Sequence, residues 1–265
     1  MHEKAISNGE DVILGAETGS GKTLAYLLPL LFDIESKRDD YQYCRSIILV
    51  PNKELSNQVV RMCNDVFPNI KIGIMPGGLR NPQDYRPFRI LESDSDSSNR
   101  IDVCVTTPAN LAQFALSPKN IDFFADVPTL VIDEADMLLD GGFLQSLNSV
   151  LMGFRRADRL DPTLKVPKTQ YIFSAATLPD FGLKSVDAFI QKRFPEATRL
   201  KMAGMHNARH YGLKDRTTWI AEENNKTRLN KLVELIHEDF IKNKEKAIIF
   251  LNSVEDTEGA AGALR

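Results

Sequence analysis

The sequence predicts an α/β protein built on a mostly parallel sheet with helices on both faces. Short runs of apolar and β-branched residues recur along the chain, helical patterns separate most of them, and polar, glycine-rich or acidic stretches follow the runs. Buried parallel strands appear in sequences as near-continuous apolar runs, and the helices that connect them cover the sheet. Ligands bind such sheets beyond the carboxyl ends of the strands, where these polar stretches fall.

Six strands and three long helices are expected before residue 195. The strands are expected at residues 11–16, 46–50, 71–75, 102–107, 129–133 and 170–175. The helices are expected at residues 22–34, 53–66 and 143–154. The longest apolar run, 24–32, contains Pro29 and is too short to span a bilayer, so it predicts a buried helix and no membrane segment.

The chain is expected to divide near residue 213. We predict a first domain at residues 1–212 and, at 213–265, a linker and the truncated start of a second α/β domain. A connecting region, 195–215, spans the boundary between them. Within the second part, 216–221 and 246–251 resemble strands. Residues 226–242 have an amphipathic helical pattern. Trp219 lies in the first of these strand-like runs and is expected in a core.

Charge and cysteine usage restrict the class of protein. Thirty-three basic and thirty-six acidic side chains give a formal net charge of −3. A general electrostatic attraction to nucleic acid is therefore excluded, and any polyanion site must be a local patch. Cys44, Cys63 and Cys104 show no metal-like spacing and predict reduced thiols in an intracellular protein.

A glycine-rich segment follows the first expected strand. Its sequence, AETGSGKT, fits the phosphate-binding motif G/A-x-x-x-x-G-K-[ST] with strand before it and helix after it. Glycines permit the tight turn that points backbone N–H groups at phosphates, and the helix adds its positive N-terminal end. Lys22 is expected to reach the β- and γ-phosphates, and Thr23 to bind Mg²⁺. The candidate nucleotide-binding residues are Ala16, Glu17, Thr18, Gly19, Ser20, Gly21, Lys22 and Thr23.

Carboxylates crowd the end of the strand at 129–133. Three acidic residues lie within four consecutive positions: Asp133, Glu134 and Asp136. Their negative charges repel one another and resist burial unless a cation or hydrogen-bond donors compensate them. By themselves they fit the N-terminus of a helix equally well. Beside a phosphate-binding loop, Asp133 is expected to hold the same Mg²⁺ as Thr23, directly or through water. Glu134 is expected to orient or deprotonate an attacking water. Lys22, Asp133 and Glu134 are therefore the candidate catalytic residues.

Together these motifs resemble those of the DEAD-box RNA helicases. AETGSGKT and DEAD (133–136) stand in the family's order and spacing. PNKELSNQ (51–58) resembles the family's PTRELAxQ, Gly77-Gly78 its glycine pair, TTPAN (106–110) its TPGR stretch, and SAATLP (174–179) its SAT motif. The resemblance implies a P-loop enzyme with two RecA-like domains that uses ATP and Mg²⁺ to remodel RNA duplexes.

The resemblance also implies which residues contact RNA. Binding would use the sugar-phosphate backbone and so show little sequence preference. By position, the implied RNA-binding residues are Pro51, Lys53, Glu54, Gly77, Gly78, Thr107, Pro108 and Asn110. Hydrolysis would be coupled to RNA binding through Asp136 together with Ala175 and Thr177, which stand at the family's Ser and Thr positions.

Several positions depart from the family pattern. Lys53 replaces an arginine, which keeps the charge but loses the bidentate fork. Asn110 also stands at an arginine position. SAAT has one extra residue, so that Ala175 takes the place of the family's serine. The Gln motif that precedes the phosphate-binding loop and the later arginine-bearing motifs are absent from the sequence. We therefore expect these residues to bind nucleotide but to hydrolyse it poorly on their own.

Two other functions remain open at this point. Another P-loop motor, such as a DNA helicase, would prefer DNA over RNA as the stimulator of hydrolysis. A transporter ATPase would need an LSGGQ-like signature, which the sequence lacks. A non-catalytic ATP-binding RNA clamp is favoured by the SAAT variant, and RNA-stimulated turnover by the full-length protein would exclude it.

Overall fold

The computed structural model describes residues 2–36, 46–75, 77, 101–139, 141–159, 168–176, 186–201, 217–219, 225–241 and 246–264. The chain divides into two compact units, Met1–Ala208 and Arg209–Arg265. This division lies close to the boundary expected between residues 212 and 213. The assignment of the two parts to helicase domains stays a prediction.

The first unit contains a seven-stranded sheet in the order β3-β4-β2-β5-β6-β1-β7, and every strand pair is parallel. The strands are β1 (Val12–Gly15), β2 (Ser46–Leu49), β3 (Ile72–Ile74), β4 (Val103–Thr106), β5 (Thr129–Ile132), β6 (Gln170–Ala175) and β7 (Thr198–Lys201). The six expected strands and the parallel α/β architecture are confirmed, and β7 is an addition.

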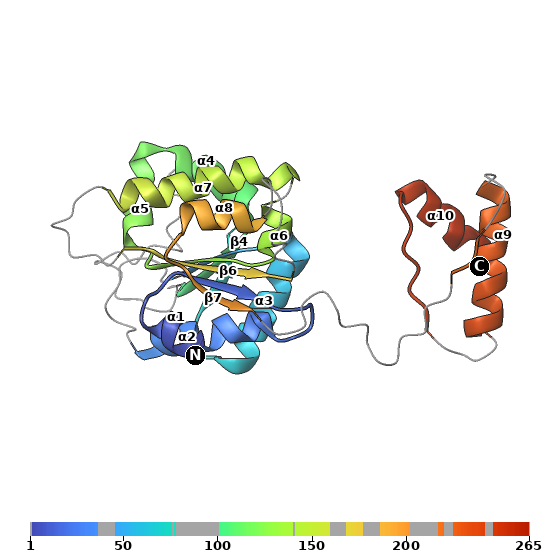
Figure 1. The fold of residues 1–265 in the computed structure, drawn as a ribbon, viewed down its shortest axis with the longest axis horizontal. Coiled ribbons are helices and arrows are strands. Elements are labelled where there is room, and N and C mark those ends of the chain that lie inside the picture. The colour runs from blue at the N-terminus through green and yellow to red at the C-terminus, as the bar shows by residue number, and fades with distance from the viewer. Residues whose placement is uncertain are drawn as a thin grey trace. The chain divides into compact units, whose positions relative to one another are not determined.

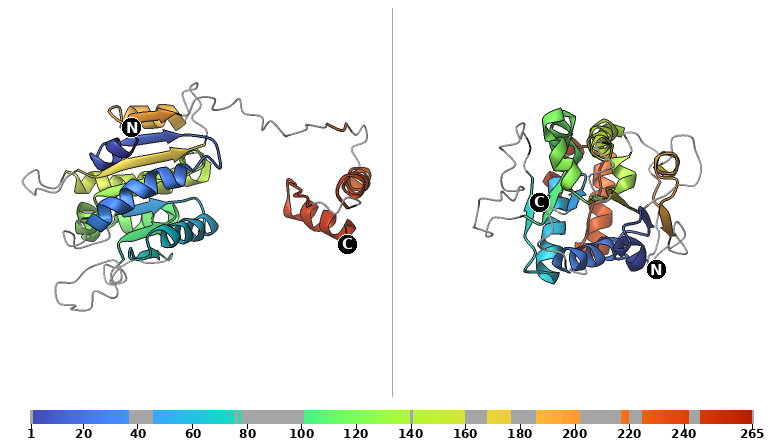
Figure 2. Two further views of the ribbon diagram at one scale, coloured as in Figure 1. Left: turned by 90° about the horizontal axis from the view of Figure 1, so that it is seen from below. Right: turned by 90° about the vertical axis from the view of Figure 1, so that its left-hand side faces the viewer.

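Helices cover both faces of this sheet (Figure 1). One face is covered by α1 (His2–Ser7), α2 (Lys22–Ser36) and α3 (Lys53–Val66), with α2 and α3 side by side in Figure 2. The other carries α4 (Pro108–Leu116), α5 (Ile121–Asp126), α6 (Ala135–Leu138), α7 (Leu144–Ala157) and α8 (Val186–Arg193), with short 3-10 turns at Pro118–Asn120 and Gly141–Phe143. Among the described residues, no helix combines the length and the apolar character needed to cross a membrane.

The sheet separates two hydrophobic cores, because successive side chains of a strand point to opposite faces. On β5, Leu130 and Ile132 belong to the core under α4 and α7, whereas Val131 belongs to the core under α2 and α3. The same alternation brings the next residue, Asp133, to the α2 face. Register therefore decides which side of the sheet receives the acidic side chain.

The edge strand β7 corrects the sequence interpretation, which placed residues 195–215 in a connecting region. Thr198–Lys201 pairs with β1 alone, and its side chains alternate between partly buried and exposed. An edge strand has one neighbour and tolerates charged side chains, such as those of Arg199 and Lys201. It therefore lacks the apolar run by which the central strands were found.

The second unit contains helices but no strand among its described residues. It has α9 (Asn225–Ile236), a π-helical turn (His237–Ile241) and α10 (Val254–Ala263), so the expected helix at 226–242 is confirmed. The strands expected at 216–221 and 246–251 are wrong for the described residues 217–219 and 246–251. A strand needs a neighbour for its backbone hydrogen bonds, and none of the described residues supplies one.

Two cysteines fit the expected reduced state. Cys63 and Cys104 are free and buried, and Cys44 lies outside the described residues. Burial raises the pKa of the Cys63 thiol to about 12, and burial also raises the pKa of Cys104. Since the thiolate is the reactive form, both side chains act as small apolar residues.

Trp219 provides a direct test of the second unit, because it is the single tryptophan of the chain and is 91% exposed. The core position expected for it is therefore wrong in this structure. We expect tryptophan fluorescence with a maximum near that of the free amino acid, efficient quenching by iodide and little change on unfolding in guanidinium. A blue-shifted emission that iodide cannot quench would show that Trp219 is covered in solution.

Candidate nucleotide-binding site

The loop between β1 and α2 has the geometry of a phosphate cradle. The backbone N–H of Ala16 donates to the carbonyl of Ala175 at 3.2 Å, which fixes the start of the loop against β6. Gly19 (φ +77°) and Gly21 (φ +88°) adopt the left-handed backbone conformation that residues with a Cβ rarely take. These two glycines turn the chain so that α2 can begin at Lys22.

Lys22 places a cation inside this loop. Its Nζ donates to the carbonyl oxygens of Ala16 at 2.7 Å and Glu17 at 3.0 Å, and the residue is only 8% exposed. An ammonium group has three N–H donors, so one remains for a phosphate oxygen. Together with the N-terminus of α2, this donor forms an anion-binding site.

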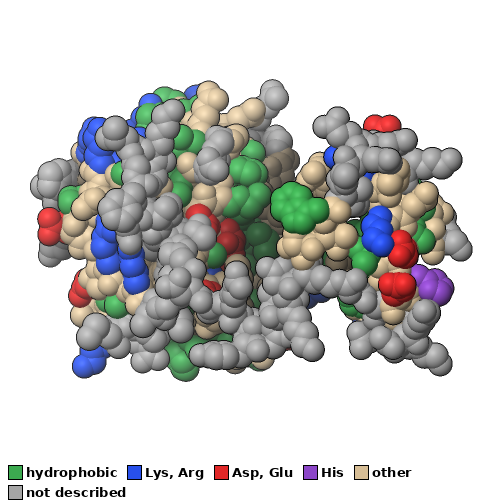
Figure 3. All heavy atoms as spheres, turned by 45° about the vertical axis from the view of Figure 1, so that its right-hand side comes forward, with side chains coloured by type: hydrophobic (Ala, Val, Ile, Leu, Met, Phe, Trp, Pro, Cys, Tyr) green, Lys and Arg blue, Asp and Glu red, His purple; other side chains and the backbone are tan. Residues whose placement is uncertain are grey.

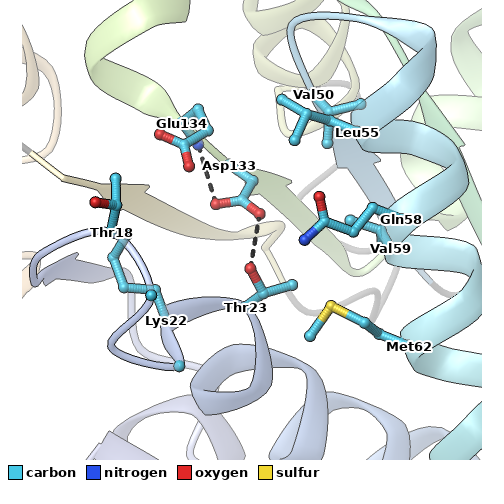
Figure 4. A pocket seen from close by; sticks show the side chains of 12 residues that line it. Thr18, Lys22, Thr23, Val50, Leu55, Gln58, Val59, Met62, Asp133 and Glu134 are labelled. Atoms are coloured by element: carbon cyan, nitrogen blue, oxygen red, sulfur yellow. Dashed lines mark hydrogen bonds between the residues drawn. The ribbon is translucent and has the colours of Figure 1, made fainter. Parts of the chain in front are cut away.

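Asp133 is a buried carboxylate, 5% exposed, that accepts hydrogen bonds from three donors. Its Oδ2 accepts from the hydroxyl of Tyr26 at 2.8 Å and from that of Thr23 at 3.4 Å. Its Oδ1 accepts from the backbone N–H of Glu134 at 3.0 Å, and Figure 4 shows the bonds to Thr23 and Glu134. Burial, and then the charge of Asp133, raise the pKa of Tyr26, which therefore stays protonated as a donor. These donors compensate the charge of Asp133 in addition to the Mg²⁺ that the sequence predicts there.

Glu134 occupies a strained turn at the beginning of α6. Its backbone is left-handed at φ 50° and ψ 48°, and it is the one non-glycine residue with positive φ among the described residues. Such conformations cost free energy and concentrate at functional sites. Burial, and then the negative charge of Asp133, raise the pKa of Glu134, while Lys22 acts in the opposite direction. A carboxylate with a raised pKa is better suited to accept a proton from water.

These groups line one side of a cleft of about 390 Å³. The opposite wall comes from the end of β2 and from α3, as Figure 4 shows. The wall residues are Val50, Leu55, Gln58, Val59 and Met62. This wall was not found from the sequence, which suggested a role only for Pro51, Lys53 and Glu54 in this stretch, as RNA-binding residues. The amphipathic pattern of residues 53–66 was the available signal.

A second cleft, of about 420 Å³, lies on the other side of the phosphate-binding loop. It is lined by the loop residues Ser20 and Gly21 and by Arg199, Leu200 and Lys201 of β7. Sequence reasoning found the loop residues but not the three residues of β7, because it did not find that strand. The loop is thus open to ligand on both sides.

The chemistry around Thr23 and Asp133 fits Mg²⁺. A hydroxyl and a carboxylate oxygen converge there at 3.4 Å, and both are the oxygen ligands that Mg²⁺ prefers. Within the described part of the chain, no cluster of three or more His, Cys, Asp or Glu side chains could hold a metal by itself. Mg²⁺ in phosphoryl-transfer sites is usually held by one or two carboxylates and by substrate phosphates. The site therefore suits a cation that arrives with a nucleotide.

Six of the residues implied to bind RNA lie at or just before the starts of α3 and α4, at the same edge of the sheet as the phosphate-binding loop, and Gly77 follows β3. Pro51 is buried, while Lys53 and Glu54 are exposed in the first turn of α3. Thr107 caps α4 by accepting from the backbone N–H of Asn110 at 3.4 Å, and Pro108 follows as its first residue. The structure brings these side chains to one edge. Their contact with RNA stays a prediction.

Asn110 has a local hydrogen-bond partner, the backbone carbonyl of Met75. Its Nδ2 donates to the carbonyl of Met75 at 3.4 Å, and its Oδ1 lies 2.7 Å from the place of a Cβ at position 77. A glycine at 77 thus leaves room for the amide. Gly78 lies outside the described residues.

The two residues at the end of β6 lie on opposite faces of the sheet. Ala175 is fully buried in the core that also contains Ala135 and Leu138 of α6, the helix that bears Asp136. Ser174 belongs to the opposite face, and its buried hydroxyl has no hydrogen-bond partner among the described residues. Thr177 lies outside the described residues, so its coupling role stays a prediction.

A parallel sheet with this phosphate-binding loop, and with an acidic strand end two strands away, defines a P-loop nucleotide-binding domain of the RecA-like type. The sequence model of the DEAD/DEAH box helicases matches residues 3–185. The chain belongs to the DEAD/DEAH box helicase family.

Curated relatives agree with this membership. The ATP-dependent RNA helicase MRH4, mitochondrial, of Coccidioides immitis is 30% identical over 242 residues, which cover 74% of this chain and 34% of the relative. The DEAD-box ATP-dependent RNA helicase 39 of Arabidopsis thaliana is 26% identical over 267 residues, which cover 96% of this chain and 38% of the relative. The chain thus spans little more than a third of these two relatives.

Solved structures share the fold. A hypothetical ATP-dependent RNA helicase from Sulfolobus tokodaii is 23% identical with a TM-score of 0.51 and covers 76% of this chain and 50% of its own. The DUF1998 helicase MrfA, solved bound to DNA, is 18% identical with a TM-score of 0.66 and covers 99% of this chain and 35% of its own. At these identities, the likeness supports the RecA-like fold.

Removing the charge of Glu134 is expected to stabilise the metal-free chain. Because its pKa is raised in the folded state, ionised Glu134 disfavours folding at neutral pH. Glu134→Gln should raise the free energy of unfolding, measured by urea denaturation in EDTA, by less than about 1 kcal/mol, since the side chain is partly exposed. The gain should be full above the folded pKa and vanish as the pH falls below the unfolded pKa. A gain that persists at acid pH would mean that charge is not its cause.

Proposed function

We propose that this chain contains the ATP-binding domain of an ATP-dependent RNA helicase, in which Mg²⁺ and ATP occupy the cleft beside Lys22. The supporting observation is that the phosphate-binding loop, the hydroxyl of Thr23 and the carboxylate of Asp133 open into one cavity. Family membership and the names of the relatives support ATP as the nucleotide and RNA as the nucleic acid. We further propose that residues 213–265 belong to a linker and the start of the second helicase domain.

Each group in the cleft has a distinct task in this proposal. The backbone N–H groups of residues 16–23 and the Nζ of Lys22 bind the phosphates. Thr23 and Asp133 would hold Mg²⁺, which when bound neutralises charge on the phosphate oxygens. Glu134 orients the attacking water and accepts its proton, as its raised pKa favours.

RNA is proposed to lie along the edge where α3 and α4 begin. Exposed Lys53, the hydroxyl of Thr107 and backbone groups at helix starts suit phosphate oxygens rather than bases. On the face drawn in Figure 3, described acidic and basic side chains are both present, and the basic ones form no continuous surface. The expected contact is therefore local and without sequence preference.

Hydrolysis by these 265 residues alone is expected to be slow. Among the described residues that line the cleft, Lys22 is the only cation. Related phosphoryl-transfer enzymes gain orders of magnitude in rate from an additional arginine at the transferred phosphate. A clamp that binds ATP and RNA without turnover is the second candidate, because Ala175 brings no hydroxyl to the face of α6.

We also propose an intracellular location. Cys63 and Cys104 are free thiols in the structure, which suits a reducing compartment. One relative is named as a mitochondrial protein, so organelles are included in this proposal.

Lys22→Ala is the primary test of nucleotide binding. Removing the ammonium leaves the phosphates with the backbone donors and Mg²⁺, so the affinity for ATP in Mg²⁺ should fall at least about tenfold, the loss expected for a charge-assisted hydrogen bond. The dissociation constant can be measured by competition against a fluorescent ATP analogue. Lys119→Ala, which removes an exposed lysine after α4, is the matched control and should bind like the unmodified chain.

Turnover in the same preparations separates the remaining functions. Negligible hydrolysis with ATP binding that depends on Lys22 agrees with an isolated helicase core. In the full-length protein, hydrolysis stimulated by RNA excludes the clamp, and stimulation by DNA in preference to RNA favours a DNA helicase. An unmodified chain that fails to bind ATP in Mg²⁺ contradicts the proposed function itself.

Lys53→Ala tests the RNA edge. Loss of one phosphate contact should weaken RNA binding several-fold for all sequences and reduce the slope of log affinity against log salt by about 0.7. Fluorescence anisotropy with two single-stranded RNAs of unrelated sequence, at three salt concentrations, gives both quantities. Lys119→Ala again serves as control. An unchanged slope would place Lys53 outside the RNA interface.

A further inference from the structure

We propose that Tyr26 is a positioning residue for the metal-binding carboxylate: its hydroxyl holds Asp133 in the orientation that receives Mg²⁺ with ATP. This inference rests on the proposed function. The direct observation is the 2.8 Å hydrogen bond from the Tyr26 hydroxyl to Asp133 Oδ2 in the interior of the first unit.

The position of Tyr26 follows from the helix that begins in the phosphate-binding loop. Tyr26 lies three residues after Thr23 and four after Lys22, so that all three side chains occupy the same face of α2. Lys22 reaches back to the loop, Thr23 faces Asp133, and Tyr26 contacts the same carboxylate from one turn deeper. One helical face therefore serves the phosphates, the cation and the carboxylate.

The hydrophobic core holds the Tyr26 side chain in place. It is fully buried and belongs to the hydrophobic core that also contains Leu30 of its own helix and Val131 and Ile172 of the sheet. A buried aromatic ring with one polar atom usually directs that atom to a partner, here Asp133. The hydrogen bond from the Tyr26 hydroxyl thus restricts the orientation of the Asp133 side chain, which lines the cleft.

The hydrogen bonds of Asp133 leave room for a cation. An ionised carboxylate has about four lone-pair sites. Tyr26 and Thr23 use Oδ2, and the backbone N–H of Glu134 uses Oδ1, so a site on Oδ1 remains. If Thr23 turns its oxygen to the metal, a second site becomes available. Tyr26 is then the donor that still fixes Oδ2.

The test compares Tyr26→Phe with Tyr171→Phe in the full 265-residue chain. Tyr171 is also buried, and its hydroxyl also donates to a carboxylate, that of Asp158 at 3.4 Å, but on the face of the sheet opposite to Asp133. Each variant loses one oxygen and keeps its ring. The measured quantities are the dissociation constant of ATP in Mg²⁺ and in EDTA, the Mg²⁺ concentration at half-saturation, and the thermal unfolding midpoint.

Tyr26→Phe should weaken ATP binding in Mg²⁺ about tenfold, the loss typical of a hydrogen bond to a charged group. It should raise the half-saturating Mg²⁺ concentration and leave binding in EDTA within about twofold. Tyr171→Phe should alter the unfolding midpoint alone. Equal behaviour of the two variants would overturn the inference, because the hydroxyl would then act only on stability. If the unmodified chain does not bind ATP, the proposed function fails before this comparison is made.

Two further measurements show whether Tyr26 acts through Asp133. In an Asp133→Asn background, Tyr26→Phe should have no additional effect on the Mg²⁺ dependence, and additive losses would contradict the inference. In the unmodified chain, the buried Tyr26 hydroxyl proton should remain visible by NMR after ATP and Mg²⁺ are added. Disappearance of that signal would show that the hydrogen bond does not survive loading. This measurement requires no variant and therefore does not depend on Tyr26→Phe folding.

Discussion

The burial of a single carboxylate, that of Asp133, is the constraint on which the site depends. β5 is a central strand, paired with β2 and β6, and Asp133, the residue that follows it, is only 5% exposed. A charge in that place is tolerated only when donors or a cation surround it. Two of its donors come from α2, which begins more than a hundred residues earlier in the chain. The sheet order brings those distant segments together, and the charge of Asp133 makes their contact necessary.

The place of each segment in the sheet explains which elements could be predicted from the sequence. The central strands are buried on both faces, so their apolar runs are visible without knowledge of their neighbours. The phosphate-binding loop is local, since left-handed glycines, a lysine and a helix start all lie within eight residues. β7 could not be found in this way, because an edge strand with alternating exposure needs no apolar run. The strand-like run at 246–251 shows the opposite error, since apolar character does not supply a pairing partner.

The parts of the site that sequence reasoning missed depend on tertiary contact. Tyr26 stands among leucines in an apolar helix and has the signature of an ordinary core residue. Its importance arises from the distance between its hydroxyl and Asp133, which no local pattern reports. The same holds for Val59 and Met62, whose side chains become a cleft wall only because α3 lies beside α2. Local motifs identify the reacting groups, whereas the groups that orient them emerge from packing.

The placement of α3 joins the two proposed binding surfaces in one rigid element. Its first turn exposes Lys53 at the edge proposed for RNA and places Leu55 against the nucleotide cleft, and later turns place Val59 and Met62 there. Because a helix held by a buried face moves as a body, we expect a displacement at one of these surfaces to be passed to the other. Asn52 strengthens this connection, since its side chain accepts from the backbone N–H of Leu55 and fixes the first turn to the rest of the helix. A side chain that alters the cleft wall can therefore change RNA binding without touching RNA.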